Sequence, residues 1–570
     1  MNFISRGGWG ILKGWNYQDF DKDTLLRKLH ERYGVSPFFK ITVEPNPIVP
    51  GQNNIRISPS GLGLPDKEYY FREDSDKIQQ AYKEYIRDVV IYMSSARNEA
   101  TKFGNDIFSY EKRIAEITPD RVMLQNPITT YNIISISELR ETNLIKFYDI
   151  LLAMYKDSQI TDQTEVIVTS IEYLHQIAQI ISTTDRKTMN GYLIWTLVRE
   201  YVPFLSDKYT SVLQNFHSNL YGIEEPMQRW EYCAKLTNRF MGLAVNYFRE
   251  KKDPLTKETM QIVNTTFDSV VVVARRKIKT DKITNGLYEH LNTKLLNLRL
   301  QIGVPKAYSD LMFLKDYYLK FKIINHNFFE NVKSAMEFQK KIEERRLSKS
   351  PPEETILSHV LAETPKVVYS ASDHAVVVPR MLVKEPIFET HFPRAIIFGR
   401  LGHEISEAVI SSILPYGSVW TAEKKILSPF HRIVDDSFKS VELTRNCLSK
   451  FIMETGNDIS DIFANETALT TSIHLSALDV AEKALGLSLE KSIHLHQPAL
   501  ENFEDTALFF LAYAQTQCSE STRQQQFYDI ITEFKLDHKS RLKLAWTQIP
   551  EFSQSLGCDF NKHFQCQKLF

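Results

Sequence analysis

The sequence predicts a mainly α protein with small β elements, folded into two large lobes. A chain of 570 residues is too long for a single hydrophobic core, so two lobes are expected. Apolar residues recur at helical spacing along most of the chain. Glycine occurs only 20 times, which argues against a loop-rich or low-complexity protein.

Helical spacing dominates the N-terminal half of the chain. Between Ser75 and Arg97, apolar residues lie three or four positions apart, as on one face of a helix. Further segments with the same spacing are predicted to be helical: 164–181, 227–248 and 280–302. The exceptions are an extended piece at 38–45 and turn-rich stretches at 46–54 and 58–67.

The pattern changes in the middle of the chain. The segment Ile302–Asp310 is the predicted boundary, which gives an N-terminal lobe of residues 1–305 and a C-terminal lobe of residues 306–570. A polar stretch follows at 343–354. Two β-branched runs around a polar turn then predict a pair of strands within 366–380. A helix over 402–410 and further helices over 415–556 complete the pattern.

Charge and hydropathy exclude several classes of function. Lys and Arg number 69 against 70 Asp and Glu, so no basic field is present for nucleic acid or for an anionic membrane surface. No apolar run approaches the roughly 18 residues that indicate a transmembrane helix. The N-terminal residues show no apolar core of a signal peptide. The chain as given is therefore expected to have no membrane segment and no nucleic-acid partner.

One predicted helix carries part of a metal-binding pattern. His403, Glu404 and Glu407 follow His-Glu-x-x-Glu, whereas zinc peptidases have His-Glu-x-x-His. The two outer positions lie one turn apart on one helix face, where two imidazoles converge on zinc and the intervening glutamate acts as general base. A carboxylate also binds zinc. The spacing alone therefore leaves two interpretations open, a metal site or a solvated helix face with one histidine.

Five motifs are spread along the whole chain. They are "GGWGILKGWN" at 7–16, "GLGLPDKEYYF" at 61–71, "QRWEYCAK" at 228–235, "IGVP" at 302–305 and "PEF" at 550–552. In order and spacing they resemble the neprilysin and endothelin-converting-enzyme family of zinc endopeptidases, and the motif at 61–71 is the most specific match. The resemblance implies a largely helical two-lobe zincin fold. It also implies a central water-filled cavity and a zinc site on the C-terminal lobe.

The resemblance assigns roles to single residues. It implies His403 as the first zinc ligand, Glu404 as the general base and Glu466 as the third ligand. Glu407 stands where the family has its second histidine ligand. Arg541 matches an arginine that stabilises the transition state. His538 matches the accompanying transition-state histidine only if a few residues have been deleted there.

Several positions depart from the family pattern. Thr470 replaces an aspartate that orients a zinc-bound histidine, and Ile410 and Ser411 replace paired aspartates after the zinc helix. Lys366 and Val367 replace the Asn-Ala that holds the peptide backbone. The loss of one such outer carboxylate typically costs about 10–100-fold in metal affinity or activity. An added anionic ligand also makes zinc a poorer Lewis acid.

These departures predict a pseudopeptidase that acts by binding a peptide or another partner. Zinc is the cofactor that the resemblance implies, and the substitutions predict that its binding is weakened or lost. A peptide is expected in the central cavity, paired with the edge of a strand. The residues of that strand are Lys366, Val367, Val368 and Tyr369. The alternative is an active zinc endopeptidase of small extracellular peptides, with His403, Glu407 and Glu466 as ligands.

Arg400 is a candidate replacement for the metal. It precedes Glu404 by four residues and Glu407 by seven, on the same helix face. Its guanidinium would neutralise both carboxylates there. A plain surface ion pair, worth under about 1 kcal/mol, is the alternative.

The cysteines complete the set of expectations. The resemblance pairs Cys447 with Cys566, and it matches Cys233, Cys518 and Cys558 to family cysteines whose partners lie upstream of this chain. The family's membrane anchor or signal peptide also lies upstream. The resemblance therefore implies a chain without its N-terminal part and a location outside the cell or at its surface. The other interpretation of the five cysteines is a set of reduced thiols in a cytosolic protein.

Overall fold

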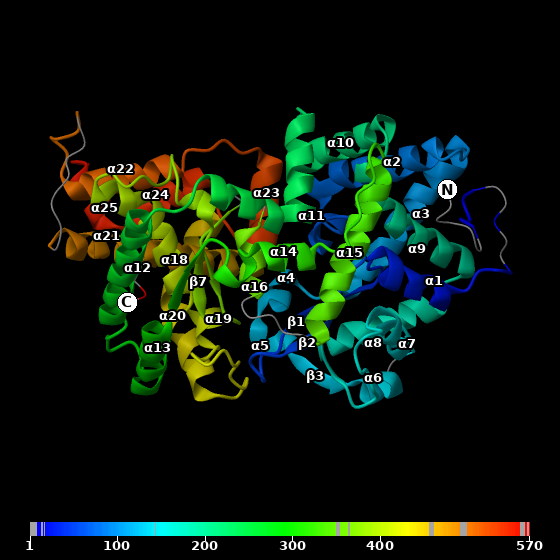
Figure 1. Ribbon diagram of the computed structural model, residues 1–570, viewed down its shortest axis with the longest axis horizontal. Coiled ribbons are helices and arrows are strands. Elements are labelled where there is room, and N and C mark those ends of the chain that lie inside the picture. Colours follow the sequence, from blue (N-terminus) through cyan, green and yellow to red (C-terminus); the bar gives the residue numbers. More distant parts are fainter. Residues whose placement is uncertain are drawn as a thin grey trace.

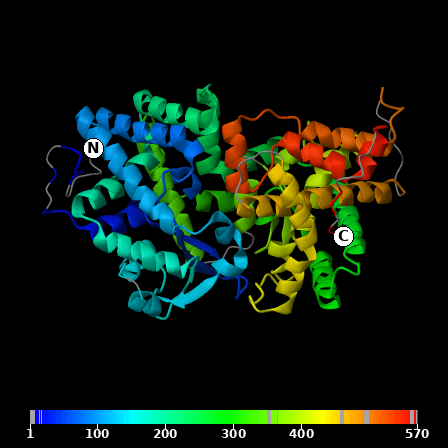
Figure 2. The same cartoon turned by 180° about the vertical axis from the view of Figure 1, so that it is seen from behind.

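Helices form most of both lobes, which confirms the predicted fold class. The computed structural model describes residues 8–12, 15, 18–142, 144–348, 354–362, 365–454, 461–490, 499–558, 565–566 and 569. The lobes lie side by side along the longest axis, with the blue and cyan N-terminal elements on one side and the orange and red C-terminal elements on the other (Figure 1; Figure 2). Parts of the motif at 7–16 and of the polar stretch at 343–354 lie outside the described residues.

The N-terminal lobe contains a four-stranded sheet surrounded by helices. The strands β1 (Phe39–Pro45), β2 (Asn53–Pro59), β3 (Asn132–Ser135) and β4 (Glu165–Val168) pair in the order β1-β2-β4-β3. β2 and β4 are parallel, and the other two pairs are antiparallel. The helices are α1 (Lys22–Lys28), α2 (Asp76–Tyr92), α3 (Arg97–Ile117), α4 (Arg121–Gln125), α5 (Pro127–Thr130), α6 (Ile136–Thr142), α7 (Phe147–Met154), α8 (Ile171–Thr183), α9 (Arg186–Tyr201), α10 (Asp207–Tyr221) and α11 (Arg229–Lys252).

The C-terminal lobe contains a smaller sheet and the predicted motif helix. Strands β5 (Arg299–Ile302), β7 (Ala375–Val378) and β6 (Val368–Ser370) pair in the order β5-β7-β6, so β6 is an edge strand. β6 and β7 are the antiparallel pair predicted within 366–380. The helical elements are α12 (Lys257–Lys277), α13 (Asn285–Asn297), α17 (Arg394–Ile397), the π-helical turn η8 (Phe398–Gly402), α18 (His403–Ser411), α19 (Pro415–Ser418), α20 (Arg432–Glu454), α21 (Asp461–Leu489), α22 (Asp505–Thr516), α23 (Arg523–Glu533), α24 (His538–Gln548) and α25 (Pro550–Ser555).

The hydrophobic cores divide the chain differently from a single boundary at residue 305. α12, α13 and β5 precede that boundary, yet their apolar residues belong to the core of the C-terminal lobe. α15 (Phe328–Ser348) follows it, packs on β1 and β2, and adds Val332 and Met336 to the N-terminal core. α14 (Leu311–Tyr317) and α16 (Glu354–Val360) lie between the two groups (Figure 1). Sequence periodicity shows that a helix has an apolar face but not which core that face meets.

Two segments predicted as helices are partly strands. Residues 164–181 contain β4 before α8, and residues 280–302 contain β5 after α13. Each strand is four residues long, too short for periodicity to distinguish a strand from a helix. Pairing with β2, β3 and β7 fixes the extended form of these strands. The helices predicted over 75–97 and 227–248 are confirmed as α2 and α11.

The motif at 61–71 wraps around a buried carboxylate. Glu111 of α3 has no exposed surface, and the hydroxyls of Tyr70 and Tyr82 donate to it at 2.8 and 3.0 Å. The backbone amide of Gly63 donates to the same carboxylate at 3.3 Å. A Cβ at Gly63 would lie 1.7 Å from the Tyr82 hydroxyl, so no side chain fits there. Burial raises the pKa of Glu111, and the charge of Arg199, 3.5 Å away, opposes this.

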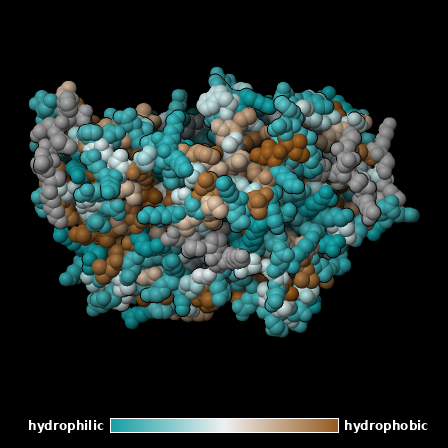
Figure 3. Space-filling model, in the orientation of Figure 1, coloured by the Kyte–Doolittle hydropathy of each residue, from teal (hydrophilic) through white to brown (hydrophobic). Residues whose placement is uncertain are grey.

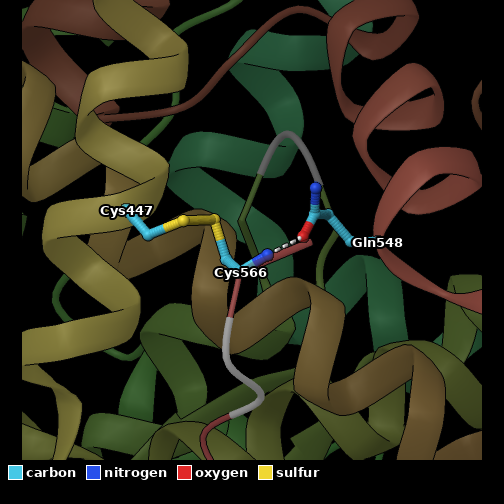
Figure 4. The surroundings of a disulfide bond; sticks show 3 residues. All are labelled: Cys447, Gln548 and Cys566. Carbon is cyan, nitrogen blue, oxygen red and sulfur yellow. Dashed lines mark hydrogen bonds between the residues drawn. A yellow bond between two sulfur atoms is a disulfide. The ribbon is translucent and has the colours of Figure 1, made fainter. Parts of the chain in front are cut away.

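The predicted disulfide is present and joins α20 to the end of the chain. Cys447 of α20 is bonded to Cys566, whose backbone amide donates to Gln548 Oε1 at 2.8 Å (Figure 4). The two cysteines are 119 residues apart, so the bond restricts a long loop of the unfolded chain. Cys233, Cys518 and Cys558 are free thiols.

α23 connects the two lobes. At its start, the Thr522 hydroxyl donates to the backbone carbonyl of Tyr221 in the N-terminal lobe. At its end, Arg121 of α4 donates from Nε to the Thr532 carbonyl at 2.8 Å. Between the lobes lies a cavity of about 850 Å³. β1 and α15 line one side of the cavity, and β6 with its following turn lines another.

The face of the molecule seen in Figure 3 is mostly hydrophilic, with separate hydrophobic patches. Within the described ranges, no helix combines the length and the apolar character that a membrane crossing needs.

Removal of the disulfide is expected to lower the melting temperature. Replacing Cys447 and Cys566 by serine restores the freedom of the loop between them in the unfolded chain, which costs about 2–5 kcal/mol of unfolding free energy. Thermal unfolding followed by circular dichroism measures this change, with Cys233→Ser, at an exposed free thiol, as the control. Equal melting temperatures for the double variant and the wild type would contradict the structural role of the bond.

A buried histidine predicts loss of stability in acid. His30 is 2% exposed and stacks on Phe39 with ring centroids 4.8 Å apart. Burial, helped by the charge of Lys340, lowers the pKa of His30 from 6.5 to about 3. The unfolded chain therefore takes up this proton below about pH 6.5, while the folded protein does not. Between pH 7 and pH 5 this one group should remove about 2 kcal/mol of unfolding free energy.

Denaturant unfolding at several pH values tests that linkage. His30→Phe keeps the stacked ring and removes the proton site, so its unfolding free energy should fall less than that of the wild type as the pH drops. His391→Gln is the control, because the His391 side chain is 88% exposed. The explanation fails if His30→Phe and the wild type lose stability in parallel.

Candidate active site

α18 positions the residues of the metal motif. Just before it, a Cβ at Gly399 would lie 2.4 Å from the Phe509 carbonyl, so the π-helical turn packs directly on α22. His403 is 1% exposed, and its Nδ1 lies 2.9 Å from the Gly399 carbonyl. Because a carbonyl only accepts, Nδ1 is the donor in this hydrogen bond. Glu404 Oε1 lies 4.0 Å from that Nε2.

Glu407 faces two basic side chains. Its Oε2 lies 3.0 Å from His474 Nδ1 on α21 and 3.7 Å from Arg541 Nη2 on α24. Burial alone would raise the pKa of Glu407, but the contact with His474 and the charge of Arg541 hold it well below its usual range. The carboxylate is therefore ionised at neutral pH. Its side chain remains 39% exposed, so solvent screens part of the attraction to Arg541.

His474 contacts both Glu407 and Arg541. Its Nδ1 is 2.6 Å from Arg541 Nη2, and its Nε2 is 2.7 Å from the Tyr513 hydroxyl on α22. Burial and the nearby charge of Arg541 lower the pKa of His474 to about 4, so the ring is neutral at neutral pH. A guanidinium only donates. The neutral Nδ1 can therefore accept from Arg541 or donate to Glu407, but not both at once.

The four residues Glu407, His474, Tyr513 and Arg541 are named the Glu407 cluster. They come from α18, α21, α22 and α24, so side chains far apart in sequence meet at one point of the C-terminal lobe. The cluster pairs its own charges, one carboxylate with one guanidinium. Two neutral polar rings complete it.

The predicted zinc ligands are not arranged as a ligand set. Glu466 of α21 is 8% exposed, and its Oε2 accepts a hydrogen bond from Tyr416 at 3.0 Å. Burial raises the pKa of Glu466, and the hydrogen bond from Tyr416 opposes this. Across the described residues, no three His, Cys, Asp or Glu side chains are grouped so that they could hold a metal ion. A guanidinium beside Glu407 also repels a dication, so the residues present do not fit zinc.

The predicted substrate strand lies beside α18. α18 contacts both β6 and β7, and β6 pairs with β7 along one edge only. Lys366, just before the strand, forms an ion pair with Glu533 at the end of α23, with Nζ and Oε2 2.9 Å apart. Val367 is buried and Val368 is half-buried. The Tyr369 hydroxyl accepts from Lys294 Nζ at 3.1 Å.

Two other predicted residues lie outside the Glu407 cluster. Arg400 donates to the Pro386 carbonyl and to Gln515 Oε1, and no ion pair joins it to Glu404 or Glu407 among the described residues. The cation beside Glu407 is Arg541 instead. His538 Nδ1 lies 3.1 Å from Gln517 Oε1. Burial and the charges of Lys535 and Arg541 lower the pKa of His538.

The residues at the positions that depart from the family pattern make contacts that stabilise the fold. Thr470 donates its hydroxyl to the carbonyl of Phe534, which ties α21 to the link before α24. Ile410 is fully buried in the core of the C-terminal lobe. The Ser411 hydroxyl donates to the Glu407 carbonyl one turn earlier, at 2.7 Å. None of these side chains supplies the outer carboxylate that the family pattern has at its position.

His474 and Tyr513 were not predicted from the sequence as site residues. His474 lies one helical turn after Thr470, so its spacing was a usable signal for a polar group on the same face. Tyr513 carries a hydroxyl within the apolar helix α22, and nothing in its local sequence indicates that it meets a histidine on another helix.

Comparison with known proteins agrees with this architecture. Two sequence models described as Peptidase family M13 match residues 3–305 and 367–568. Endothelin-converting enzyme 1 of Homo sapiens is 23% identical over 572 residues, which cover 98% of this chain and 72% of that enzyme.

Solved structures show the same fold. An inhibitor complex of a zinc metalloprotease from Mycobacterium tuberculosis has a TM-score of 0.84 at 18% identity, over 96% of this chain and 83% of the other. PepO from Lactobacillus rhamnosis has a TM-score of 0.78 at 12% identity, with the same coverage of 96% and 83%. The resemblance to the neprilysin and endothelin-converting-enzyme family is confirmed, and the chain belongs to Peptidase family M13.

Proposed function

We propose that this member of Peptidase family M13 is a pseudopeptidase that binds peptides without hydrolysing them. Membership of the family implies zinc, and the proposal is that this chain has lost it. The observation that carries the proposal is the contact of Glu407 with Arg541 and His474. At the position of the second ligand, a carboxylate is already neutralised by a residue of the same chain.

The surroundings of Glu404 and Arg541 support the proposed loss of hydrolysis. Glu404 is present as a possible proton acceptor, but a base needs an activated water to act on. Arg541, which matches a transition-state residue, faces Glu407 and His474 rather than an open position. A donor already occupied by a carboxylate stabilises a developing oxyanion poorly.

Peptide binding is supported by geometry that does not depend on zinc. β6 pairs with β7 on one side, and no strand covers its other side among the described residues. Such an edge offers backbone donors and acceptors to an extended peptide. The 850 Å³ cavity, lined partly by β6, provides space for the peptide between the lobes.

The proposed location is outside the cell or at its surface. The support is the disulfide between Cys447 and Cys566, because such bonds persist in oxidising compartments and are rare in the cytosol.

Metal content and hydrolysis test the proposal together. Wild-type protein purified without chelators is expected to contain far less than one zinc per chain. It should show no chelator-sensitive cleavage of a quenched fluorogenic peptide. Glu407→His restores two imidazoles one turn apart and should raise zinc occupancy measured by atomic emission. Stoichiometric zinc in the wild type, with cleavage that a chelator abolishes, would establish the active endopeptidase instead.

Within the Glu407 cluster, Arg541→Met alone should lower the unfolding free energy more than Arg541→Met combined with Glu407→Gln. Arg541→Met leaves the Glu407 carboxylate without its cation and is expected to lower the unfolding free energy by about 1–3 kcal/mol. Adding Glu407→Gln to that variant should recover part of the loss, because no unpaired charge remains. A double-mutant cycle by denaturant unfolding measures the coupling. A coupling energy of zero would show that Glu407 and Arg541 do not compensate each other's charge.

A further inference from the structure

Lys294 of α13 is a buried lysine directly behind the wall of the cavity between the lobes. Its side chain has no exposed surface, and its Nζ donates to the Tyr369 hydroxyl at 3.1 Å and to the Trp420 carbonyl at 2.7 Å. Tyr369 belongs to β6, whereas Trp420 follows α19, and both residues line the cavity. One amino group therefore joins two parts of the wall that are far apart in sequence.

The Tyr369 hydroxyl has a second partner, His374, in the turn between β6 and β7. It lies 3.0 Å from His374 Nδ1, and His374 Nε2 lies 2.9 Å from the Lys294 carbonyl. Because a carbonyl only accepts, Nε2 is the donor to Lys294. Burial lowers the pKa of His374 to about 4, so its ring is neutral at neutral pH and Nδ1 accepts from the hydroxyl. The hydrogen bonds form a closed ring through Lys294, Tyr369 and His374.

The turn that carries His374 is itself fixed. His374 is 2% exposed and has a left-handed backbone with a φ of 48°, a conformation that histidine adopts more readily than most residues. The Ser370 hydroxyl donates to Asp373 Oδ2 at 2.7 Å, and Arg299 Nη2 donates to the Asp373 carbonyl at 3.0 Å. The imidazole is therefore held in one place at the end of β6.

Trp420 connects Lys294 to the contact between the lobes. The Trp420 ring is 6% exposed and meets Tyr131 of the N-terminal lobe edge to face, with ring centroids 5.8 Å apart. Trp420 also forms a β-bridge with Ile426, whose amide donates to the carbonyl of Pro47 in the N-terminal lobe at 3.0 Å. Lys294 is therefore bonded both to the edge strand and to a segment through which the C-terminal lobe meets the N-terminal one.

The two hydrogen bonds of Lys294 do not require a positive charge. Burial lowers the pKa of Lys294 to about 7, so ammonium and neutral amine are both present near neutral pH. A neutral amine keeps two N–H donors, which is the number that Tyr369 and Trp420 accept. Either protonation state of Lys294 therefore supplies both bonds.

We propose that Lys294 is a positioning residue of the peptide site, which holds β6 and Trp420 in the arrangement that accepts a peptide. Lys294 has no surface with which to touch the peptide, and it acts through the hydroxyl of Tyr369 and the backbone of Trp420. An edge strand held in place loses little further freedom when a peptide pairs with it, which favours binding. This inference rests on the proposed peptide-binding function.

Peptide retention and affinity test the inference. Wild-type protein is mixed with random hexapeptides that carry acetylated N-termini and amidated C-termini, and the retained peptides are identified by mass spectrometry. One retained peptide is then labelled, and its Kd is measured by fluorescence anisotropy. If the wild type retains no peptide above the protein-free background, the proposed binding function is overturned and the inference with it.

Two substitutions assign the effect to the contact between Lys294 and Tyr369. Lys294→Met keeps an unbranched apolar chain and removes the donors, so the Kd should rise about tenfold. Tyr369→Phe removes only the hydroxyl and should raise the Kd less. The double variant should bind no more weakly than Lys294→Met alone, because the hydroxyl contact is already lost there. Additive losses of affinity would overturn the assignment to this contact.

Controls separate positioning from a general loss of stability. The variant with Cys447→Ser and Cys566→Ser, which is expected to be less stable, should keep the wild-type Kd. Lys257→Met, at an exposed lysine of α12, should also keep it. Emission from Trp420 is taken as the difference between each protein and the same protein with Trp420→Phe. Acrylamide should quench this emission more strongly in Lys294→Met than in the wild type or the disulfide variant.

The remaining outcomes concern the inference alone. A folded Lys294→Met variant with the wild-type Kd would overturn it. An equal loss of affinity in the disulfide variant would also overturn it, because the loss would then follow stability rather than the position of β6. If Lys294→Met does not fold, an unchanged Kd in Tyr369→Phe has the same consequence.

Discussion

The pairing of Glu407 with Arg541 is the interaction on which the candidate site depends. An ionised carboxylate inside a helical lobe needs a compensating positive charge, which a metal ion or a side chain can supply. Here the guanidinium comes from α24 and lies 3.7 Å from the carboxylate, with His474 between the two helices. The charge balance that a metallopeptidase obtains from its ion is thus obtained from the chain itself.

The apolar and polar faces of α18 have separate roles. The apolar face packs in the core of the C-terminal lobe, and the polar face carries the residues of the metal motif. Ile405, Val409 and Ile410 are completely buried and belong to the core of the C-terminal lobe. They hold α18 in place whether or not the polar face binds an ion. The edge strand β6 is likewise fixed by β7, whose residues are all buried. The strand edge that we propose to bind a peptide therefore does not depend on a metal ion for its position.

The sequence predicted those parts of the structure that depend on local pattern. The amphipathic helices, the strand pair at 366–380 and, through resemblance, the disulfide were all predicted, and the structure confirms them. The short strands β4 and β5 escaped detection because their extended form comes from pairing with distant strands.

The site was less predictable than the fold. Helix periodicity placed Arg400 near Glu407 along one helix, whereas the cation that reaches Glu407 is more than a hundred residues away in sequence, on α24. The same limit hid His474 and Tyr513, which meet Glu407 only because α21 and α22 pack against α18 and the turn before it. One-turn spacing describes neighbours on one helix and says nothing about which other helices face it.

α23 links the N-terminal lobe to the start of β6. Thr522, which caps its start, is bonded to Tyr221 of the N-terminal lobe, and its last residue, Glu533, is paired with Lys366 just before β6. As a single helix, it transmits displacement along its length. A separation of the lobes must break the contacts of α23 with Tyr221 and Arg121, or carry the helix with the N-terminal lobe and break its ion pair with Lys366. The contacts between the lobes and the ion pair just before β6 are therefore made by the same helix.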